Sequence, residues 1–532
     1  MNSPDLDLRD RTALFRMLAS QQFDVAVIGG GITGAGIARD AAMRGLSVTL
    51  VEARDFASGT SSRSSKLVHG GIRYLAQGDM AVVREASLER KIVRAIAPHL
   101  ARRTLFVVPA RNVAGIARFR TGLWTYEKLG SVERDDRHEL WNNERLKREE
   151  PALITEGLAG AIVYPEYVTD DGRLTLANIR SAAAHGAVVA NYAAVTGIDC
   201  VNGAAEALTV VDGLNADNQA RLRARVIVNA AGPWADQVRK LEYADAGTRL
   251  ALSKGIHLVV SRQRLPIHHT VTMTAADRRG VFVVPREGVA YLGTTDTFYP
   301  DSDYWPAITG EDVDYLLAAA NGVFSVEPLT RRDVIGVWSG IRPLIAEPGK
   351  KAPSEISRRD EVMEGPAGII TISGGKLTAY RRMADRIVDL ALKRLGRSAP
   401  GGTTAEEALP GGALSETPSA LSARLAAGGM EAEQAARLVM LYGTEAEALV
   451  GGGVAAEARH AVLKEGALTL EDYWVRRSAR ARFDLDGGLA ALLPAAEAMA
   501  PLLGWSEAEI ERQVDACRAL RRAERAALGD DV

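Results

Sequence analysis

Residues 24–52 constrain the fold of this 532-residue chain more than any other stretch. The apolar run at 24–28 is typical of a short, buried parallel strand. Residues 32–44 carry a helical pattern, and a second apolar run at 47–51 ends beside Glu52. A strand, a helix, a second strand and a terminal acid at this spacing predict an α/β unit that binds a dinucleotide.

Three glycines with the spacing G-x-G-x-x-G join the first strand to the helix. Gly29 allows the tight turn, Gly31 lets the backbone approach a pyrophosphate, and Gly34 lets helix and strand pack closely. A carboxylate at Glu52 suits the ribose 2′-hydroxyl. The alternative is a glycine turn used only for packing, and the unit alone does not separate NAD from FAD. The cofactor residues predicted here are Gly29, Gly30, Gly31, Ile32, Thr33, Gly34 and Glu52.

A second unusual stretch, residues 57–75, contains five serines, one threonine and three glycines. A polar surface linker would have such a composition. However, the stretch continues into an apolar run without a break, and it follows the second strand on the cofactor side of the expected sheet. Small hydroxyls and backbone N–H groups there suit hydrogen bonds to a phosphate and to a ring edge.

Composition excludes several classes of protein. A net charge of −2 argues against a general nucleic-acid binder. The two cysteines, Cys200 and Cys517, form neither a disulfide framework nor a metal motif, and this favours a reducing compartment. The eight histidines show no ligand spacing, so no metal site is predicted. Residues 1–20 lack a signal-like apolar run, and no apolar run reaches spanning length, so membrane contact is expected only as a peripheral one.

Six motifs give the chain a resemblance to a known family. They are Thr-Ser-Ser-x-Ser-Ser-Lys-Leu-x-His-Gly-Gly-x-Arg-Tyr-Leu at 60–75, Asn-Ala-Ala-Gly-Pro-Trp at 229–234, Lys-Gly-Ile-His at 254–257, Gly-Thr-Thr-Asp at 293–296, Ser-Gly-Ile-Arg-Pro-Leu at 339–344 and Ser-Gly-Gly-Lys-Leu-Thr at 373–378. In this order they resemble the FAD-dependent glycerol-3-phosphate dehydrogenases, within the D-amino-acid-oxidase-like flavoproteins. The resemblance is close over about residues 22–400 and looser beyond. One departure is Ala231, where the family often has threonine.

The resemblance and the residue patterns together imply an α/β fold. We expect an FAD-binding, Rossmann-like domain of the glutathione-reductase type, an inserted antiparallel β-rich substrate domain, and a helical C-terminal domain. The expected boundaries are 1–22 for an N-terminal extension, 23–400 for the oxidoreductase region and 401–532 for the C-terminal domain; FAD-binding stretches fall at about 23–110, 155–235 and 360–395, and the substrate domain mainly at 240–360.

Several local patterns sharpen this expectation. Residues 14–18 suit either a short amphipathic helix or a partly ordered tail. The pattern at 197–225 predicts a β-meander, followed by a separate parallel strand at 226–231. Strand-like alternation recurs at 256–260, 281–285, 290–294 and 334–341, while 396–416 is rich in Gly, Pro, Ser and Thr and predicts a linker.

The function implied by the resemblance is oxidation of sn-glycerol 3-phosphate to dihydroxyacetone phosphate, with hydride transfer to FAD and electrons passed to a membrane quinone. The implied location is cytoplasmic, peripheral on the inner face of the plasma membrane, and a homodimer is one assembly that we consider. Alternatives are a glycerol-3-phosphate oxidase that uses oxygen and a flavin-bound membrane scaffold without turnover. An NAD-dependent dehydrogenase leaves residues 60–71 unexplained.

Residues 115–130 combine Arg120 and Lys128 with Trp124, a mixture that interfacial membrane contacts use. The residues alone favour an ordinary, partly buried helix. The resemblance shifts the expectation toward membrane contact, because bacterial relatives are peripheral enzymes of the inner membrane.

The resemblance also suggests which side chains carry the chemistry. An arginine fork suits a phosphate, so Arg342 and Arg358 are expected to hold it, although Arg358 beside Arg359 and Asp360 is as readily a structural ion pair. His257 is the candidate acceptor of the hydroxyl proton, while a lone histidine in a strand is more often structural. The predicted catalytic residues are His257, Arg342 and Lys376, and the predicted substrate residues are Arg73, Tyr74, Arg342, Arg358 and Thr378.

The remaining predicted FAD residues come from four separate parts of the sequence. They are Thr60, Ser61, Ser62, Ser64, Ser65, Lys66, His69, Gly70, Gly71, Val195, Ala231, Gly232, Trp234, Gly374, Gly375, Lys376, Leu377 and Thr378. Val195 is expected to meet the adenine edge with its backbone. Lys376 is expected to face the N1–C2 edge of the flavin or the substrate.

Overall fold

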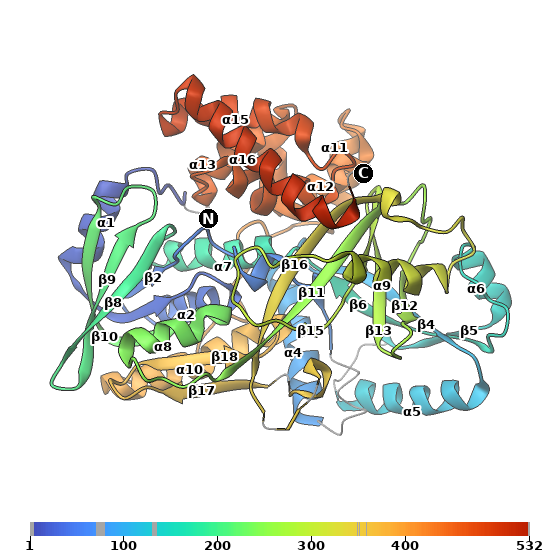
Figure 1. Cartoon of the computed structure of the whole chain (residues 1–532), viewed down its shortest axis with the longest axis horizontal. Coiled ribbons are helices and arrows are strands. Elements are labelled where there is room, and N and C mark those ends of the chain that lie inside the picture. The colour runs from blue at the N-terminus through green and yellow to red at the C-terminus, as the bar shows by residue number, and fades with distance from the viewer. Residues whose placement is uncertain are drawn as a thin grey trace.

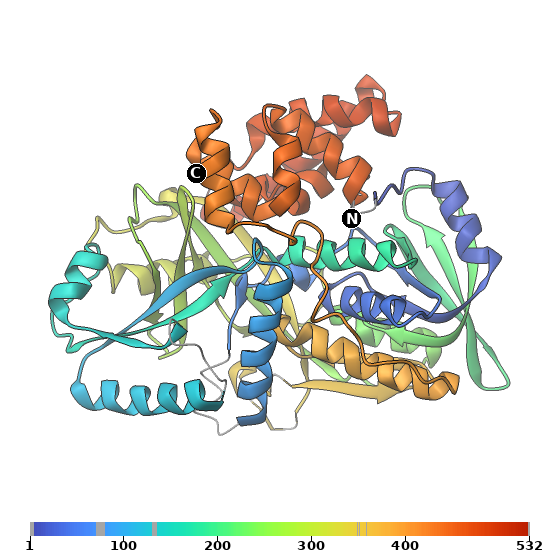
Figure 2. The ribbon, with the colours of Figure 1, turned by 180° about the vertical axis from the view of Figure 1, so that it is seen from behind.

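The computed structural model describes residues 5–70, 80–129, 136–347, 349–350, 352–357 and 359–529. Figure 1 shows a layered α/β part at the left, a second sheet at the right and a helical C-terminal part, in orange and red, above them. Figure 2 shows the same arrangement from behind, and in this view too the C-terminal helices lie above both sheets.

The first sheet has eight strands within the described residues. Their order is β17-β18-β10-β1-β2-β7, and β9 and β8 extend from β10. The central pairs around β1 and β2 are parallel, whereas β17 runs antiparallel to β18 at one edge. The bounds are β1 (Gln22–Ile28), β2 (Val48–Val51), β7 (Val188–Ala190), β8 (Ala193–Val201), β9 (Ala204–Asp212), β10 (Gln219–Asn229), β17 (Asp360–Glu364) and β18 (Ile370–Gly374).

Three helices lie side by side on one face of this sheet: α2 (Ile32–Met43), α7 (Asp171–Ala184) and α10 (Tyr380–Leu395). Helix α2 buries Ile37 and Ala41 against the strands, and α10 adds Met383 and Ile387 to the same apolar cluster. The helical pattern expected at 32–44 is confirmed because its small apolar residues repeat with the period of a helix and face the sheet.

The opposite face carries β8, β9 and the first half of β10, together with α1 (Arg11–Ser20) and α8 (Ala235–Glu242). Helix α1 forms because Asp10 Oδ1 accepts a hydrogen bond from Ala13 N at its start (2.9 Å) and because Phe15 and Leu18 are buried. Of the two expectations for this segment, the amphipathic helix is therefore the correct one.

Strand β10 corrects one sequence expectation. The predicted meander is present, but its last strand and the expected strand at 226–231 form one continuous strand. Residues Gln219 to Arg223 pair antiparallel with β9, and the strand continues parallel to β1 through Asn229. The sequence suggested a break because polar residues alternate in the first half, where one face is exposed, and stop where both faces become buried.

The second sheet has ten strands among the described residues. Its order is β15-β11-β14-β13-β12-β4-β6-β3, with β16 beside β11 and β5 beside β6. The four strands expected from alternation are confirmed in β11, β13, β14 and β16, although β14 ends at Gly293, one residue before the expected end. The bounds are β3 (Leu67–Val68), β4 (Arg102–Ala110), β5 (Glu139–Trp141), β6 (Gly160–Val168), β11 (Leu250–Ser261), β12 (Thr270–Thr274), β13 (Gly280–Arg286), β14 (Val289–Gly293), β15 (Thr297–Phe298) and β16 (Val334–Ile345).

This sheet draws strands from outside residues 240–360, because β4 pairs with β12 in parallel and with β6 in antiparallel register. Local alternation cannot reveal such long-range pairing. Helices α6 (Asn143–Glu149) and α9 (Gly310–Asn321) pack on the sheet, with Leu146 and Leu316 in its apolar core.

Two further helices, α4 (Met80–Ile96) and α5 (Val113–Leu129), lie on the side of the molecule away from the C-terminal helices (Figures 1 and 2). Leu123 of α5 is buried against Val83 and Ile162, while Val113 and Trp124 are 73% and 58% exposed. Helix α5 is therefore amphipathic, with part of its apolar surface turned to solvent.

The helical C-terminal part is confirmed beyond residue 417. Its elements are α11 (Pro418–Ala427), α12 (Ala432–Tyr442), η7 (Gly443–Leu449), α13 (Gly453–Glu465), the π-helical η8 (Asp472–Arg477), α14 (Arg480–Phe483), α15 (Leu489–Leu503), α16 (Glu507–Arg525) and η9 (Ala526–Leu528). The connection at 396–416 lacks regular structure but packs closely on α2. There Arg39 donates to the carbonyls of Thr404 (3.1 Å) and Glu407 (2.8 Å).

Candidate functional site

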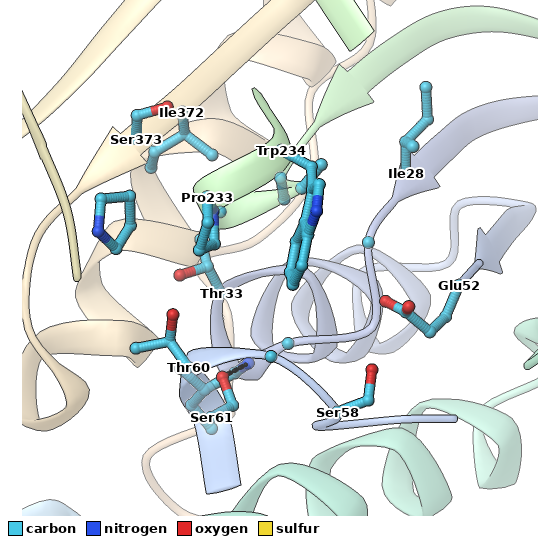
Figure 3. Close-up of a pocket in the computed structure, with 18 of the residues that line it drawn as sticks. Ile28, Thr33, Glu52, Ser58, Thr60, Ser61, Pro233, Trp234, Ile372 and Ser373 are labelled. Carbon is cyan, nitrogen blue, oxygen red and sulfur yellow. Dashed lines mark hydrogen bonds between the residues drawn. The ribbon is translucent and has the colours of Figure 1, made fainter. Parts of the chain in front are cut away.

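A cavity of about 510 Å³ lies where α2 begins, at the carboxyl ends of β1 and β2. Figure 3 shows the labelled residues converging on it from several parts of the chain, with Glu52 on one side, Thr60 and Ser61 below, and Ile372 and Ser373 opposite. This is the edge at which open α/β sheets bind ligands, and the volume lies in the usual range for ligand sites.

The glycine turn has the close contacts that the sequence predicts. Gly29 has φ +111°, and a Cβ atom there would lie 2.6 Å from the carbonyl oxygen of Ala230. A Cβ atom at Gly34 would lie 1.9 Å from the carbonyl oxygen of Gly29. Neither position accommodates a side chain, so the turn brings the N-terminus of α2 against the cavity.

Glu52 is positioned by the backbone around it. Its Oε2 accepts from Gly30 N (2.7 Å), and its Oε1 accepts from Arg54 N (2.9 Å). Burial raises the pKa of Glu52, and these two N–H groups oppose that shift. The carboxylate is thus held at the cavity wall, where a ribose would meet it.

The serine-rich stretch lines the floor of the cavity and is bonded to both neighbouring parts of the fold. Ser61 Oγ accepts from Ile32 N at the start of α2 (2.9 Å), and Thr60 Oγ1 donates to the Ile341 carbonyl of β16 (2.6 Å). Lys66 is not among the lining residues, but its Nζ lies 2.5 Å from Oδ1 of buried Asp171, which is one of them.

Trp234 closes one side of the cavity. It ends η3 (Gly232–Trp234), and its indole lies so near Gly59 that a Cβ atom there would be 2.8 Å from the ring. Figure 3 shows the indole standing between Glu52 and Pro233.

Two of the cations that line the cavity were predicted and come from parts of the chain far from the glycine turn: Arg342 on β16 and Lys376 just after β18. Arg342 Nη1 lies 3.1 Å from Asp296 Oδ1, and Nη2 donates to Thr294 Oγ1 (3.0 Å). The guanidinium lies against Gly255, where a Cβ atom would be 2.4 Å from Nη2. The absence of a side chain at Gly255 therefore makes room for the arginine.

His257 lies behind the cavity and is not among its lining residues. It is 1% exposed, its Nε2 lies 2.9 Å from Ser65 Oγ, and its ring stacks on Trp338 with centroids 4.6 Å apart. Burial lowers the pKa of His257 well below its usual value, and the charges of Arg342 and Lys66 add to that effect. The imidazole is therefore neutral near pH 7.

Most of the predicted residues that the structure describes come together at this cavity. Those that line it are Gly29, Gly31, Ile32, Thr33, Glu52, Thr60, Ser61, Ser64, Val195, Ala231, Gly232, Trp234, Arg342, Gly374, Gly375, Lys376 and Leu377. Those that are not among its lining residues are Gly30, Gly34, Ser62, Ser65, Lys66, His69, Gly70, His257 and Thr378. Gly71, Arg73, Tyr74 and Arg358 lie outside the described residues.

Among the second group, Thr378 has a defined backbone contact. Its Oγ1 lies 3.2 Å from both the amide nitrogen and the carbonyl oxygen of His69. Thr378 therefore joins the end of the serine-rich stretch to η6 (Leu377–Ala379), at the start of α10.

About half of the lining residues are not among those predicted from the sequence, and Arg54, Asp171 and Tyr304 belong to this group. Arg54 follows Glu52 by two positions, and this proximity is the only sequence signal that could have found it. Its guanidinium lies 4.0 Å from the ring centroid of Tyr304. Tyr304 comes from a loop of the second sheet, and only the folded chain brings it to the cofactor side.

Comparison with known proteins defines the class of this site. A family model described as FAD dependent oxidoreductase matches residues 24–381, and one described as the C-terminal domain of alpha-glycerophosphate oxidase matches residues 402–510. With the cavity described above, these matches define an FAD-dependent oxidoreductase. The aerobic glycerol-3-phosphate dehydrogenase of Staphylococcus aureus (strain USA300) is 39% identical to this chain over an alignment of 528 residues. The match covers 94% of each chain. The chain belongs to this glycerol-3-phosphate dehydrogenase family, and its cofactor is FAD.

Solved structures agree with this assignment. The glycerol-3-phosphate dehydrogenase from Bacillus halodurans, complexed with FAD, matches with TM-score 0.81 and 34% identity over 98% of this chain and 99% of that one. The L-alpha-glycerophosphate oxidase from Mycoplasma pneumoniae, with FAD bound, matches with TM-score 0.57 and 19% identity, over 73% and 99% of the two chains, which shows a shared fold alone. The resemblance and the fold class inferred from the sequence are thus confirmed.

The residues present fit FAD. The glycine turn and the start of α2 suit the pyrophosphate, Glu52 suits the adenosine ribose, and the backbone beyond Gly374 suits the flavin end. When bound, FAD supplies the acceptor for a hydride. Across the described parts of the chain, no helix has the length and apolar character needed to cross a bilayer.

Proposed function

We propose that the protein oxidises sn-glycerol 3-phosphate to dihydroxyacetone phosphate, with the hydride passing to FAD and the electrons then passing to a membrane quinone. The observation that carries the substrate is the presence of Arg342 and Lys376 in the wall of the FAD cavity. A small phosphorylated alcohol needs fixed cations beside the flavin, and the relative from Staphylococcus aureus is named for this substrate.

In this proposal Arg342 binds the substrate phosphate. Its planar fork remains charged and matches phosphate oxygens, and the bond to Thr294 together with the contact to Gly255 orients it. Asp296 balances part of its charge. Arg358, Arg73 and Tyr74 remain predicted substrate residues, and Lys376 is proposed to stabilise negative charge at the flavin or on the substrate.

The hydroxyl proton is proposed to pass to His257. A neutral imidazole can accept a proton, and burial, which lowers the pKa of His257, keeps it neutral before the transfer while making it a weaker base. Because Nε2 of His257 lies 2.9 Å from Ser65 Oγ, the proposed route is a relay in which the Ser65 hydroxyl gives its own proton to Nε2 and takes the proton of the substrate hydroxyl. Ser65 thus becomes part of the proposed site in a role that the sequence did not suggest.

The acceptor is the second part of the proposal. A glycerol-3-phosphate oxidase that uses oxygen is the competing function, and the match of residues 402–510 to an oxidase C-terminal domain favours it. We prefer a quinone because the 39% identical relative is named a dehydrogenase and because α5 exposes Trp124 beside Lys128, whose Nζ lies 5.7 Å from the indole centroid. An aromatic and a cation side by side suit the headgroup region of a bilayer.

We accordingly propose a cytoplasmic protein bound peripherally to the inner face of the plasma membrane. A homodimer stays a prediction, which the molar mass in solution tests. A flavin-bound scaffold without turnover is the alternative that the experiment below also addresses.

The deciding experiment is anaerobic visible spectroscopy of the purified holoprotein with and without glycerol 3-phosphate. Bleaching of the flavin band at ~450 nm is the expected result, because the cofactor takes the hydride. A flavin that stays oxidised would contradict the substrate and favour the scaffold. After bleaching, reoxidation by a soluble quinone but not by oxygen supports the dehydrogenase, whereas rapid oxygen consumption supports the oxidase.

A further inference from the structure

We propose that the helical C-terminal domain retains FAD by holding two walls of the adenosine half of its cavity, through Arg476 and Arg477. Neither residue lines the cavity, so both act as positioning residues. The proposal depends on FAD as the cofactor and not on the identity of the substrate.

The first wall is the loop that carries Glu52. Three residues later stands Asp55, which is fully buried. Arg477 donates to both of its oxygens, Nη1 to Oδ2 (2.5 Å) and Nη2 to Oδ1 (2.8 Å), and Arg476 Nε donates to Oδ2 (2.5 Å). Two arginines of the C-terminal domain thus bind one carboxylate on the cofactor loop, 422 and 421 residues away in sequence.

The loop from Glu52 to Asp55 is short and bonded along its length. Ala193 N donates to the Glu52 carbonyl (2.7 Å), and Tyr192 N donates to the Arg54 carbonyl (2.8 Å). The hydroxyl of Tyr192 in turn donates to Asp472 Oδ1 (2.6 Å) in the C-terminal domain. A displacement of Asp55 would therefore be transmitted to the carboxylate of Glu52, because few freely rotating bonds separate them.

The second wall is Tyr304, which lines the cavity from the other sheet. Its hydroxyl donates to Glu471 Oε1 (3.3 Å) and accepts from Arg476 Nη1 (3.4 Å). Arg476 also donates to Glu471 Oε1 (2.8 Å). The same arginine therefore contacts Asp55 on one wall and Tyr304 on the other.

This second wall is a single layer of side chains. Arg54 and Tyr304 line the cofactor cavity, and both also line a second cavity of about 680 Å³ at the base of the C-terminal domain. The stacked pair, with 4.0 Å between the guanidinium carbon and the ring centroid, is thus part of the partition between the two cavities. Opening it would expose the adenosine half of the site to the neighbouring cavity.

The local structure of the C-terminal segment explains how two consecutive arginines reach inward. Residues Asp472 to Arg477 form a π-helix, in which Ser478 N donates to the Tyr473 carbonyl (2.9 Å). The wider turn changes the direction of successive side chains, and π-helical turns occur frequently at functional sites. Asp472 Oδ1 also accepts from Arg476 Nη2 (2.8 Å), which fixes this guanidinium between its partners.

The test compares two arginines with the same geometry at the same domain interface. Arg477 binds Asp55 on the cofactor loop, whereas Arg180 on α7 binds Glu445 with Nη1–Oε2 and Nη2–Oε1 distances of 2.8 and 2.7 Å. Both are almost fully buried. The variants Arg477→Met and Arg180→Met each remove a two-bond ion pair with one carboxylate, and of these two pairs only that of Arg477 reaches the Glu52 loop.

The measurement is the rate of FAD release from each purified holoprotein after dilution, followed by the rise in flavin fluorescence, beside the thermal unfolding temperature. We expect Arg477→Met to release FAD at least about tenfold faster than the wild type. Loss of affinity on this scale is typical of metal sites when a residue that supports a ligand-binding side chain is replaced. We expect Arg180→Met to release FAD at the wild-type rate even where its unfolding temperature falls equally.

Wild-type FAD release from Arg477→Met would overturn the proposal, and so would equal acceleration in both variants, since that result indicates only general destabilisation. Tyr304→Phe tests the second wall independently. If Arg477→Met does not fold, the result with Tyr304→Phe decides the proposal. It removes the hydroxyl that meets Glu471 and Arg476 but keeps the ring under Arg54, so faster release is expected and an unchanged rate would contradict the proposal.

Discussion

Nε2 of His257 lies 2.9 Å from the hydroxyl oxygen of Ser65, although 192 residues separate them in the sequence. The contact joins the substrate sheet to the serine-rich stretch that lines the FAD cavity. It also gives Nε2 a hydroxyl partner, while Trp338 covers a face of the imidazole ring.

The first prediction concerns His257. We expect His257→Ala to slow flavin reduction by glycerol 3-phosphate by about 10²-fold or more, the usual contribution of a general base. Anaerobic stopped-flow absorbance measures this rate, and an unchanged flavin spectrum before mixing controls for folding. Ser65→Ala should slow reduction as well if the proton passes through the hydroxyl. Near-normal reduction in His257→Ala would remove it from the role of base.

The second prediction concerns Arg342. Replacing it with methionine should raise the KM for glycerol 3-phosphate by roughly 10- to 100-fold, because charge-assisted hydrogen bonds to a phosphate would be lost. Steady-state dye reduction measures the effect. Glycerol, which lacks the phosphate, is the internal control: its slow oxidation should change little. An equal loss with both substrates would mean that Arg342 supports the fold of the site and does not bind the phosphate.

The third prediction concerns the glycine turn. A Cβ atom at Gly34 would lie 1.9 Å from the backbone oxygen of Gly29, so Gly34→Ala should destabilise the protein by about 1–3 kcal/mol or more and yield protein without bound FAD. The ratio of flavin to protein absorbance measures this. Gly280→Ala is the matched control, since a Cβ atom there meets nothing within 4 Å. FAD retained at wild-type occupancy in Gly34→Ala would show that this close packing is unnecessary.

The fourth prediction concerns α5. Removing the exposed indole and its neighbouring cation in Trp124→Ala/Lys128→Ala should weaken binding to anionic lipid vesicles by at least about fivefold, because a single basic residue near such a surface contributes about 1 kcal/mol. Co-sedimentation with vesicles measures the affinity. Leu493→Ala is the control: this residue is also exposed, but it lies on α15 at the far side of the molecule (Figure 1). Equal binding of all variants would exclude α5 as the contact.

The fifth prediction concerns pH. Burial is the main cause that lowers the pKa of His99 to about 3, so the folded protein leaves it neutral while the unfolded chain protonates it below pH ~6.5. Protonation therefore favours unfolding, and stability is lost as the pH falls. Between pH 7 and pH 5 the wild type should lose about 2 kcal/mol more than His99→Gln. Urea unfolding at both pH values measures this, and parallel losses would contradict the buried, neutral state.

Much of the first sheet could be predicted because its determinants are local. Residues 24–52 specify strand, turn, helix and strand through apolar periodicity and through glycines whose missing side chains create the required contacts. The same holds for the helices of the C-terminal domain. The prediction divides the continuous β10 into two strands, because its burial pattern changes halfway along the strand. In the local sequence such a change looks the same as a boundary between two strands.

It was harder to predict from the sequence which strands form the second sheet. Strand β4 pairs with β12 although more than a hundred residues separate them, β6 then pairs with β4, and no local pattern encodes the pairing of β4 with β12. In the same way, the irregular connection at 396–416 looked like a linker, yet Arg39 binds its carbonyl groups and orders it.

The sequence by itself determined the dinucleotide unit, the family and about half of the residues that line the FAD cavity, because motif spacing reflects contacts made within a few residues. Only the tertiary structure decided that His257 stands behind Ser65, that Arg54 stacks on Tyr304, and that two arginines of the C-terminal domain meet Asp55. These contacts depend on sheet register and on the docking of helices onto sheets, and distances of that kind arise only when the whole chain packs.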